Sequence, residues 1–364
     1  MNKLNYKEIK TSLLNIFHKY NNLLIVIQGS PDPDAIASSF FLMKMAQTCD
    51  CSCTVIAGKT ISLPQNRELI SKLNITLNHN YPEDFDEYDG YCVVDYQNPA
   101  VENIPSQVPC VLHIDHHTRA ESSVNPEYSL YPEDVNSVST VLAGVLLQQN
   151  DLFDDKIRQQ IATALAYGIK TDTDNLTIAS TTDKEAFSEM EKIADKEILD
   201  LLDNMPYSEE TLTLISKAML NSTNYKSWLI SGLGFIPETL RDSLAITADY
   251  MLEQENVTTV IAFALITSEN SITLDASFRT KNSELDLNGI IKSITPDGGG
   301  RSFKGAFQLD LSYFAGYPEK HSLWSIVNES TLINIKKARD NISFYEVRTF
   351  FTGLKKQLSD IFHR

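Results

Sequence analysis

The stretch Val111-Leu112-His113-Ile114-Asp115-His116-His117 places three metal-capable side chains directly after an almost entirely apolar run. Short apolar runs of this kind are typical of buried strands, and a strand that ends in such groups is a common way to build a hydrolytic metal site. A polar triplet alone also arises by chance in a chain of this length. The rest of the sequence therefore has to supply the other ligands.

Several further apolar runs read as strands, separated by segments with helical spacing. The runs with strand character are Leu23 to Ile27, Thr54 to Ala57, Tyr91 to Val94 and Val111 to Ile114. The segments with helical character are Ala35 to Ala46, Val138 to Leu147 and Ile157 to Tyr167. This alternation predicts an α/β fold with a parallel sheet covered by helices on both faces.

The pattern changes after the first half of the chain. Residues from about Asp183 to Thr223 are helical and charged, Ala245 to Leu252 is helical, and Val257 to Ile266 and Ile272 to Arg279 resemble strands. We expect four parts: a parallel-sheet domain at 1–190, a helical connector at 191–225, a smaller α/β domain at 226–330 and a helical extension at 331–364.

Composition narrows the class of protein. The chain has 364 residues, five cysteines and a formal net charge of −17. An odd cysteine number argues against a disulfide framework, and no run reaches the roughly 18 apolar residues of a membrane span. We expect a cytoplasmic protein without a membrane partner. The negative charge disfavours binding to long nucleic acid, which depends on many Lys and Arg contacts to phosphate.

Four more aspartates lie where an apolar or helical pattern ends. Asp32 and Asp34 follow the first strand, Asp95 closes the run Tyr91 to Asp95, and Asp172 lies where a buried helical pattern breaks. Two of them also have a plainer interpretation: Asp32 is placed to cap the next helix, and Asp95 alone resembles a surface aspartate. Because ligands bind at the carboxyl ends of parallel strands, these side chains should converge in space.

The donor set defines a chemistry. Carboxylates combined with imidazole suit manganese or another divalent ion of similar hardness. Two such ions about 3.5 to 4 Å apart can activate water and stabilise both oxygens of an in-line phosphoryl displacement. Phosphoester hydrolysis is therefore the reaction that these residues fit best.

The four segments, in this order, resemble the motifs of the DHH phosphoesterase family, with Asp115-His116-His117 as the third motif. Gly298-Gly299-Gly300-Arg301 resembles the glycine-rich motif of the type-one DHH-associated C-terminal domain. The resemblance spans roughly residues 20 to 315. The class that the chain resembles includes nanoRNases, dinucleotide phosphodiesterases, phosphoadenosine-phosphate phosphatases and RecJ-like exonucleases.

The resemblance implies a role for each residue around two divalent ions, with Mn²⁺ as the favoured metal. It assigns Asp32 to one ion, Asp34 to the other and Asp95 to both. It adds His116 and Asp172 to the ion of Asp34. Asp115 would orient the histidine pair, and His117 would lie near the scissile phosphate.

The resemblance also implies a substrate-binding set in the second domain. Arg279 matches a position that contacts phosphate or base, and Gly298, Gly299, Gly300 and Arg301 match a loop that contacts phosphate. The plainer interpretations are an exposed arginine at a strand end and a simple turn. Two positions depart from the family pattern: Gln28 and Arg301 each stand where a histidine is usual. A glutamine carbonyl is a weaker ligand than imidazole, so metal occupancy at Gln28 is in doubt.

The resemblance implies a metal-dependent phosphodiesterase that cleaves linear dinucleotides such as pGpG or pApA, or very short oligonucleotides, to nucleoside monophosphates. The alternatives are a catalytically weak nucleotide-binding regulator, a phosphoadenosine-phosphate phosphatase and a single-strand exonuclease. Family II pyrophosphatases share the metal motifs, but the glycine motif and Arg279 point away from them. The amphipathic stretch Leu332 to Arg364 reads as a solvated helix face, and a homodimer or partner contact stays open.

Overall fold

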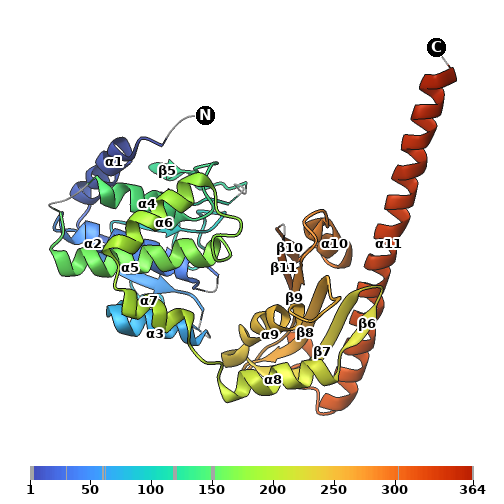
Figure 1. Cartoon of the computed structure of the whole chain (residues 1–364). Helices are drawn as coiled ribbons and strands as arrows, with labels where there is room; N and C mark the ends of the chain where they lie inside the picture. The colour runs from blue at the N-terminus through green and yellow to red at the C-terminus, as the bar shows by residue number, and fades with distance from the viewer. Residues whose placement is uncertain are drawn as a thin grey trace. The chain divides into compact units, whose positions relative to one another are not determined.

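The computed structural model describes residues 4–29, 31–59, 61, 63–117, 121–148, 152–301 and 303–362, with side chains up to residue 341. The chain divides into two compact units, Met1–Met205 and Pro206–Arg364, which are described separately (Figure 1). Residues 363 and 364 of the expected C-terminal extension lie outside the described residues. Along the described part of the chain, no helix combines the length and apolarity that a membrane crossing requires.

The first unit contains a five-stranded sheet in the order β2-β1-β3-β4-β5, and its strands are all parallel. The strands are β1 (Asn22–Ile27), β2 (Ser52–Ala57), β3 (Gly90–Val94), β4 (Cys110–Ile114) and β5 (Tyr128–Leu130). Ile27 pairs with Val94, and Val94 pairs with Ile114. The residues that follow β1, β3 and β4 are therefore brought to the same edge of the sheet, as predicted for a parallel fold.

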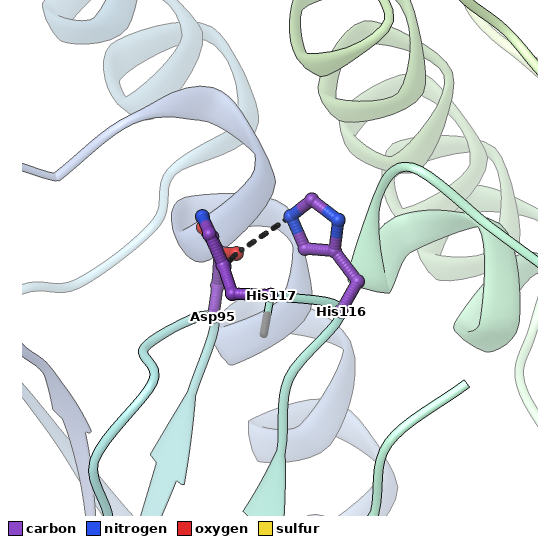
Figure 2. Close-up of side chains that lie close together, drawn as sticks. All are labelled: Asp95, His116 and His117. Carbon is purple, nitrogen blue, oxygen red and sulfur yellow. Dashed lines mark ion pairs between the residues drawn. The ribbon is translucent and has the colours of Figure 1, made fainter. Parts of the chain in front are cut away.

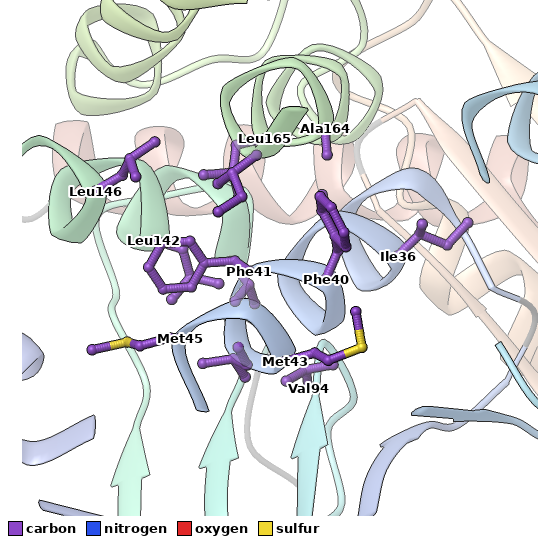
Figure 3. Close-up of a cluster of buried hydrophobic side chains, with 14 of the residues drawn as sticks. Ile36, Phe40, Phe41, Met43, Met45, Val94, Leu142, Leu146, Ala164 and Leu165 are labelled. Carbon is purple, nitrogen blue, oxygen red and sulfur yellow. The ribbon is translucent and has the colours of Figure 1, made fainter. Parts of the chain in front are cut away.

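Seven helices of the first unit pack into one hydrophobic cluster with the sheet. They are α1 (Tyr6–Lys19), α2 (Pro33–Gln47), α3 (Pro64–Leu73), α4 (Val138–Leu147), α5 (Asp155–Asp172), α6 (Thr181–Ile193) and α7 (Lys196–Asp203). Figure 3 shows Phe40 and Phe41 of α2 among side chains from α4 and α5. Almost every residue of α2 is buried, and α2 confirms the helix predicted at Ala35 to Ala46.

The parallel α/β fold is confirmed, with one refinement to its second face. The sequence predicted helices on both faces of the sheet. On the second face, however, residues of β1, β2 and β3 pack against Val101, Ile104 and Val108, which belong to an irregular segment. Prolines at positions 82, 99, 105 and 109 interrupt these connections. Proline lacks a backbone N–H and disfavours helix interiors, so loops cover this face.

The second unit contains a mixed six-stranded sheet in the order β10-β11-β9-β8-β7-β6. Its strands are β6 (Thr223–Tyr225), β7 (Trp228–Pro237), β8 (Thr259–Thr267), β9 (Ile272–Thr280), β10 (Gly298–Gly300) and β11 (Lys304–Asp310). Its helices are α8 (Glu209–Leu220), α9 (Ser243–Leu252), α10 (Leu287–Ile294) and α11 (Lys320–Phe362), with short 3₁₀ turns at Glu238–Leu240 and Ser312–Phe314. One face of the sheet packs with α8 and α9, and the other with α10 and α11.

Most expected elements of the second unit are present, with two differences. The expected strands at 257–266 and 272–279 correspond to β8 and β9, and the charged segment 183–223 is helical. That segment is shared between the units, because α6 and α7 lie in the first and α8 in the second. The residues Gly298 to Gly300, expected in a loop, instead form β10, an edge strand paired with β11.

Gly90 tests the packing of the sheet. A methyl group on Gly90 would lie 2.6 Å from Val111 Cγ1 and 2.9 Å from the carbonyl oxygen of Pro109. We expect Gly90→Ala to lower the free energy of unfolding by about 1–3 kcal/mol, as overpacking does, measured by urea unfolding followed by circular dichroism. Gly58→Ala is the matched control, since a methyl group there meets only the Tyr81 hydroxyl at 3.9 Å. Equal midpoints for both variants would contradict this packing.

Candidate metal centre

Asp95 lies at the centre of the predicted ligands. It directly follows β3, it is only 7% exposed, and its φ of 51° is left-handed. Its N–H donates to the carbonyl oxygen of Ile114 in the next strand at 2.9 Å. Aspartate tolerates the left-handed region better than most residues. This turn directs the chain out of the sheet immediately after the strand ends.

His116 lies between two carboxylates. Its Nε2 atom is 2.9 Å from Asp172 Oδ2 and 3.3 Å from Asp95 Oδ1. Figure 2 shows the contact with Asp95, with His117 beside it. Ligand atoms of Asp34, Asp95, His116 and Asp172 all lie within 4.8 Å of one another. The structure therefore brings together four side chains: two that follow β3 and β4, one from the start of α2 and one from the end of α5.

The polar atoms of this group have unfilled hydrogen-bonding capacity. Asp95 Oδ1, His116 Nε2 and Asp172 Oδ2 are buried and form no hydrogen bond of good geometry. Buried polar atoms in folded proteins nearly always have a partner, so three that converge need an explanation. Two carboxylate oxygens and an imidazole nitrogen are suitable ligands for a divalent cation. The residues present therefore fit a metal ion.

Asp34 is fixed by the start of α4. Its two carboxylate oxygens accept hydrogen bonds from the backbone N–H groups of Val138 and Ser139, each at 2.7 Å. These are unsatisfied donors at a helix N-terminus, where a negative charge is favourable. Asp34 is fully buried, and the helix leaves it little freedom to move.

The start of α4 is in turn held by Asp183 of α6, which the sequence analysis did not identify. Asp183 is fully buried and accepts from Thr140 Oγ1 at 2.7 Å and from the Ser180 N–H at 2.8 Å. It also accepts from the backbone N–H of Asn136 at 3.1 Å. The acidic residue three positions after Ser180 was a visible capping-box pattern, but its contacts with α4 depend on tertiary structure.

Gln28 directly follows β1, and Asp32 immediately precedes α2. Both side chains form hydrogen bonds outside this group of ligand atoms. Asp32 caps α2, accepting from the N–H of Ala35 at 2.9 Å, as its plainer interpretation predicted. Among the described residues, Asp32 belongs to neither cluster of closely spaced ligand atoms. The Gln28 amide nitrogen donates to the carbonyl oxygen of Asn98 at 2.8 Å. A second cation would therefore meet a weaker donor set at Gln28, Asp32 and Asp95.

His117 forms a second group of closely spaced ligand atoms with Asp95 and His116, and it also pairs with Asp115. Nδ1 of His117 is 2.7 Å from Asp115 Oδ1 and 3.6 Å from Asp95 Oδ1. Asp115 is fully buried. Its carboxylate can only accept a hydrogen bond, so the proton of His117 lies on Nδ1. Nε2 is then the nitrogen available to a substrate or a water molecule. The expected orienting role of Asp115 stays a prediction that this geometry suits.

The crowding of acids changes their proton affinity. Burial, followed by the charge of Asp172, raises the pKa of Asp32 to about 6 and that of Asp34 to about 7. Burial and then Asp32 also raise the pKa of Asp95. Burial opposes the charge of His116, but the adjacent carboxylates of Asp172 and Asp95 outweigh it and raise the pKa of His116 to about 11. In the metal-free protein the carboxylates of Asp32, Asp34 and Asp95 therefore bind protons more tightly than usual, and a cation that binds them would displace those protons.

The predicted substrate-binding residues lie in the second unit. Arg279 Nε donates to Asp249 Oδ1 at 2.6 Å, and Nη1 donates to Ser277 Oγ at 2.9 Å. Its side chain is 11% exposed, so it is not the freely exposed arginine of the plainer interpretation. Arg301 is exposed and donates its backbone N–H to the carbonyl oxygen of Lys304 at 2.8 Å.

The glycines of β10 have a packing role that is visible in the structure. A methyl group on Gly298 would lie 2.7 Å from the carbonyl oxygen of Ala306, and one on Gly300 would lie 3.0 Å from Leu287 Cβ. The Gly300 N–H donates to Asn288 Oδ1 at 3.3 Å. Close packing against β11 and α10 therefore explains glycine at these positions, whether or not phosphate also binds there.

Comparison with known proteins gives results for both sequence and fold. Residues 22–169 match the DHH family, N-terminal domain. An uncharacterized protein of Methanocaldococcus jannaschii is 30% identical over 312 residues, which are 85% of this chain and 62% of that protein. The cyclic-di-AMP phosphodiesterase PdeA of Listeria monocytogenes is 26% identical over 182 residues, which are 47% of this chain and 27% of that protein. The matches thus span less than two thirds of each curated relative.

A solved structure resembles the chain over most of its length. The exopolyphosphatase-related protein of Bacteroides fragilis aligns with 93% of this chain and 100% of its own, with a TM-score of 0.67 and 19% identity. At this identity the likeness concerns the fold.

The raised pKa values predict how metal binding depends on pH. Because the folded, metal-free protein holds extra protons on Asp32 and Asp34, these groups favour folding at low pH, and that contribution is lost as pH rises from about 4 through about 7. Mn²⁺ binds the ionised carboxylates, so we expect it to raise the melting temperature more at pH 8 than at pH 5. Differential scanning fluorimetry with and without EDTA measures this shift, and an equal shift at both pH values would contradict the protonated cluster.

Proposed function

We propose, from the match of residues 22–169 to the DHH family, N-terminal domain, that the chain is a divalent-metal-dependent phosphoesterase. The observation that carries the proposal is the convergence of Asp95 Oδ1, His116 Nε2 and Asp172 Oδ2, three buried atoms without hydrogen bonds. Such a group is costly unless a cation satisfies it. Phosphoester hydrolysis is the chemistry that this donor set serves best.

Two ions, with Mn²⁺ favoured, would be held by two sets of residues that share Asp95. The first would bind Asp34, Asp95, His116 and Asp172, and the second would bind Asp32 and Asp95, with Gln28 as a weak additional donor. When bound, such ions polarise phosphoryl oxygens and supply a nucleophile at neutral pH. The chain's own contribution is to hold these ligands at fixed positions, through α4 for Asp34 and through β4 for Asp95.

His117 is proposed to act on the substrate itself. Its Nδ1 proton is directed to Asp115 Oδ1 at 2.7 Å, so Nε2 can accept a hydrogen bond or, once protonated, donate one to a phosphate oxygen. His117 is the more exposed of the two histidines, with 22% of its side chain accessible against 3% for His116. Substrate contact therefore fits His117, and metal ligation fits His116.

We further propose that the substrates are linear dinucleotides such as pGpG or pApA, or very short oligonucleotides, cleaved to nucleoside monophosphates. A net charge of −17 disfavours long nucleic acid. The Listeria relative is named a cyclic-di-AMP phosphodiesterase, which supports a dinucleotide ligand. In the domain proposed at 226–330, Asp249 and Ser277 hold Arg279 in place, and a planar guanidinium suits the geometry of a phosphate.

A second candidate is a nucleotide-binding regulator with weak or no turnover. Gln28 favours it, because its amide nitrogen is occupied by the Asn98 carbonyl at 2.8 Å, which leaves only a neutral oxygen to bind metal. Binding of a dinucleotide without hydrolysis under Mn²⁺, Mg²⁺ or Co²⁺ would decide for the regulator.

A substrate panel with Mn²⁺ tests the proposed activity. We expect cleavage of pGpG or pApA in preference to phosphoadenosine phosphate and longer single strands, and cyclic dinucleotides are assayed beside them. Asp95→Ala should lower turnover by at least about 10²-fold, as expected when electrostatic stabilisation of the transition state is lost. Asp154→Asn is the control, because Asp154 caps α5 and asparagine caps equally well. Full activity of Asp95→Ala would rule out this centre.

Arg279 provides a separate test of the second unit. We expect Arg279→Ala to raise KM more than it lowers kcat, because it removes binding common to ground and transition states. Arg279→Lys should recover only part of the loss, since lysine keeps the charge but lacks the planar fork. Steady-state kinetics on the best dinucleotide measures both, and an unchanged KM in Arg279→Ala would remove this residue from the substrate site.

A further inference from the structure

We propose that His113 is a positioning residue that holds Asp95 in its left-handed turn and so maintains the geometry of the metal centre. The inference rests on the proposed function only for the role of Asp95 as a ligand. His113 is fully buried, in a strand of five buried residues, and it is the only polar one among them. It lies outside the cluster of candidate ligands.

The turn at Asp95 needs external support. A φ of 51° is unfavourable for any residue with a Cβ atom, and here the side chain must also be kept among other acids. Backbone conformations of this kind persist where surrounding contacts fix them. An Asp95 that relaxed to an ordinary φ would carry its carboxylate away from His116, which is 3.3 Å from it.

Two hydrogen bonds from β4 fix this turn. The Asp95 N–H donates to the Ile114 carbonyl oxygen at 2.9 Å. His113 Nε2 lies 2.7 Å from the carbonyl oxygen of Tyr96, the next residue. A carbonyl only accepts, so Nε2 carries the proton and donates. The backbone of Asp95 and Tyr96 is thus bound at both ends to consecutive residues of one strand.

The other side of the imidazole is also occupied. Nδ1 lies 2.7 Å from the Tyr131 hydroxyl, which donates to it, and the two rings meet edge to face with centroids 5.1 Å apart. This hydroxyl selects the tautomer with the proton on Nε2. A polar ring in an apolar strand is unfavourable unless both nitrogens are bonded. Phenylalanine could fill the space, but it could not hold the Tyr96 carbonyl.

The same segment is tied to β1 from the opposite side. The Gln28 amide nitrogen donates to the Asn98 carbonyl oxygen at 2.8 Å. The residues after β3 are therefore held by both neighbouring strands, through His113 on one side and Gln28 on the other. Without the hydrogen bond from His113, the backbone of Asp95 and Tyr96 would keep one of these two bonds to β4, the bond to the Ile114 carbonyl oxygen.

Mn²⁺ titration followed by electron paramagnetic resonance tests this role without a substrate. We expect His113→Phe to weaken Mn²⁺ binding by about 10-fold or more, the range found for residues that orient metal ligands. His113→Gln, whose amide can donate to the Tyr96 carbonyl, should recover part of that affinity. Tyr131→Phe should weaken binding in the same direction, because the tautomer is no longer selected.

Thr163→Val is the matched control. Thr163 is also fully buried in the first unit, and it donates to the Gln159 carbonyl oxygen at 2.7 Å and accepts from the Asp195 N–H at 2.8 Å. It should lower the melting temperature and leave Mn²⁺ affinity unchanged, which separates general stability from ligand positioning.

The outcomes distinguish this proposal from the proposed function. A folded His113→Phe protein that binds Mn²⁺ as tightly as the wild type overturns the positioning role. If His113→Phe does not fold, wild-type affinity in Tyr131→Phe overturns it instead. A wild-type protein that binds no Mn²⁺ refutes the metal centre itself, and a protein that binds Mn²⁺ but cleaves no phosphoester refutes only the activity.

Discussion

Mutual repulsion among buried carboxylates is the constraint on which the rest of the first unit depends. Asp32, Asp34, Asp95 and Asp172 gather at the carboxyl end of a parallel sheet, and burial together with neighbouring charge raises the pKa of the first three. One imidazole, His116, offsets part of this charge. A divalent cation would satisfy both the charge and the orphaned atoms. The fold must then keep repelling groups close together, which requires rigid supports.

Those supports come from backbone donors and acceptors more than from side-chain pairs. Two N–H groups at the start of α4 hold Asp34, and Asp183 holds the start of α4. The peptide groups around Asp95 are bound to Ile114 and His113. Packing in the core fixes the positions of the helices and strands, so the ligand side chains attached to them are held in fixed positions as well. This arrangement explains why polar residues such as His113 and Asp183 lie fully buried.

Much of the fold could be predicted from local sequence pattern. The apolar runs at 23–27 and 91–94 and the almost entirely apolar run at 111–114 predicted central parallel strands, since both faces of such strands are covered. Asp172 was recognised because a helical pattern breaks there, and it is the last residue of α5. Asp32 was recognised as a helix cap by its position before Pro33.

Other features depended on contacts between distant residues. The left-handed φ of Asp95 and the bonds of His113 to Tyr96 and Tyr131 join segments from three strands, which no local pattern specifies. Gly298 to Gly300 were expected to form a loop, because glycine lets the backbone approach a ligand closely. In the structure these residues form an edge strand, where the approach of β11 and α10 excludes a side chain.

The cation site of the first unit is the feature on which the proposed activity depends. Anomalous diffraction at the manganese edge, from crystals grown with Mn²⁺, tests it most directly. We predict a strong peak enclosed by Asp34, Asp95, His116 and Asp172. Ordered side chains without a peak at this position would contradict the account.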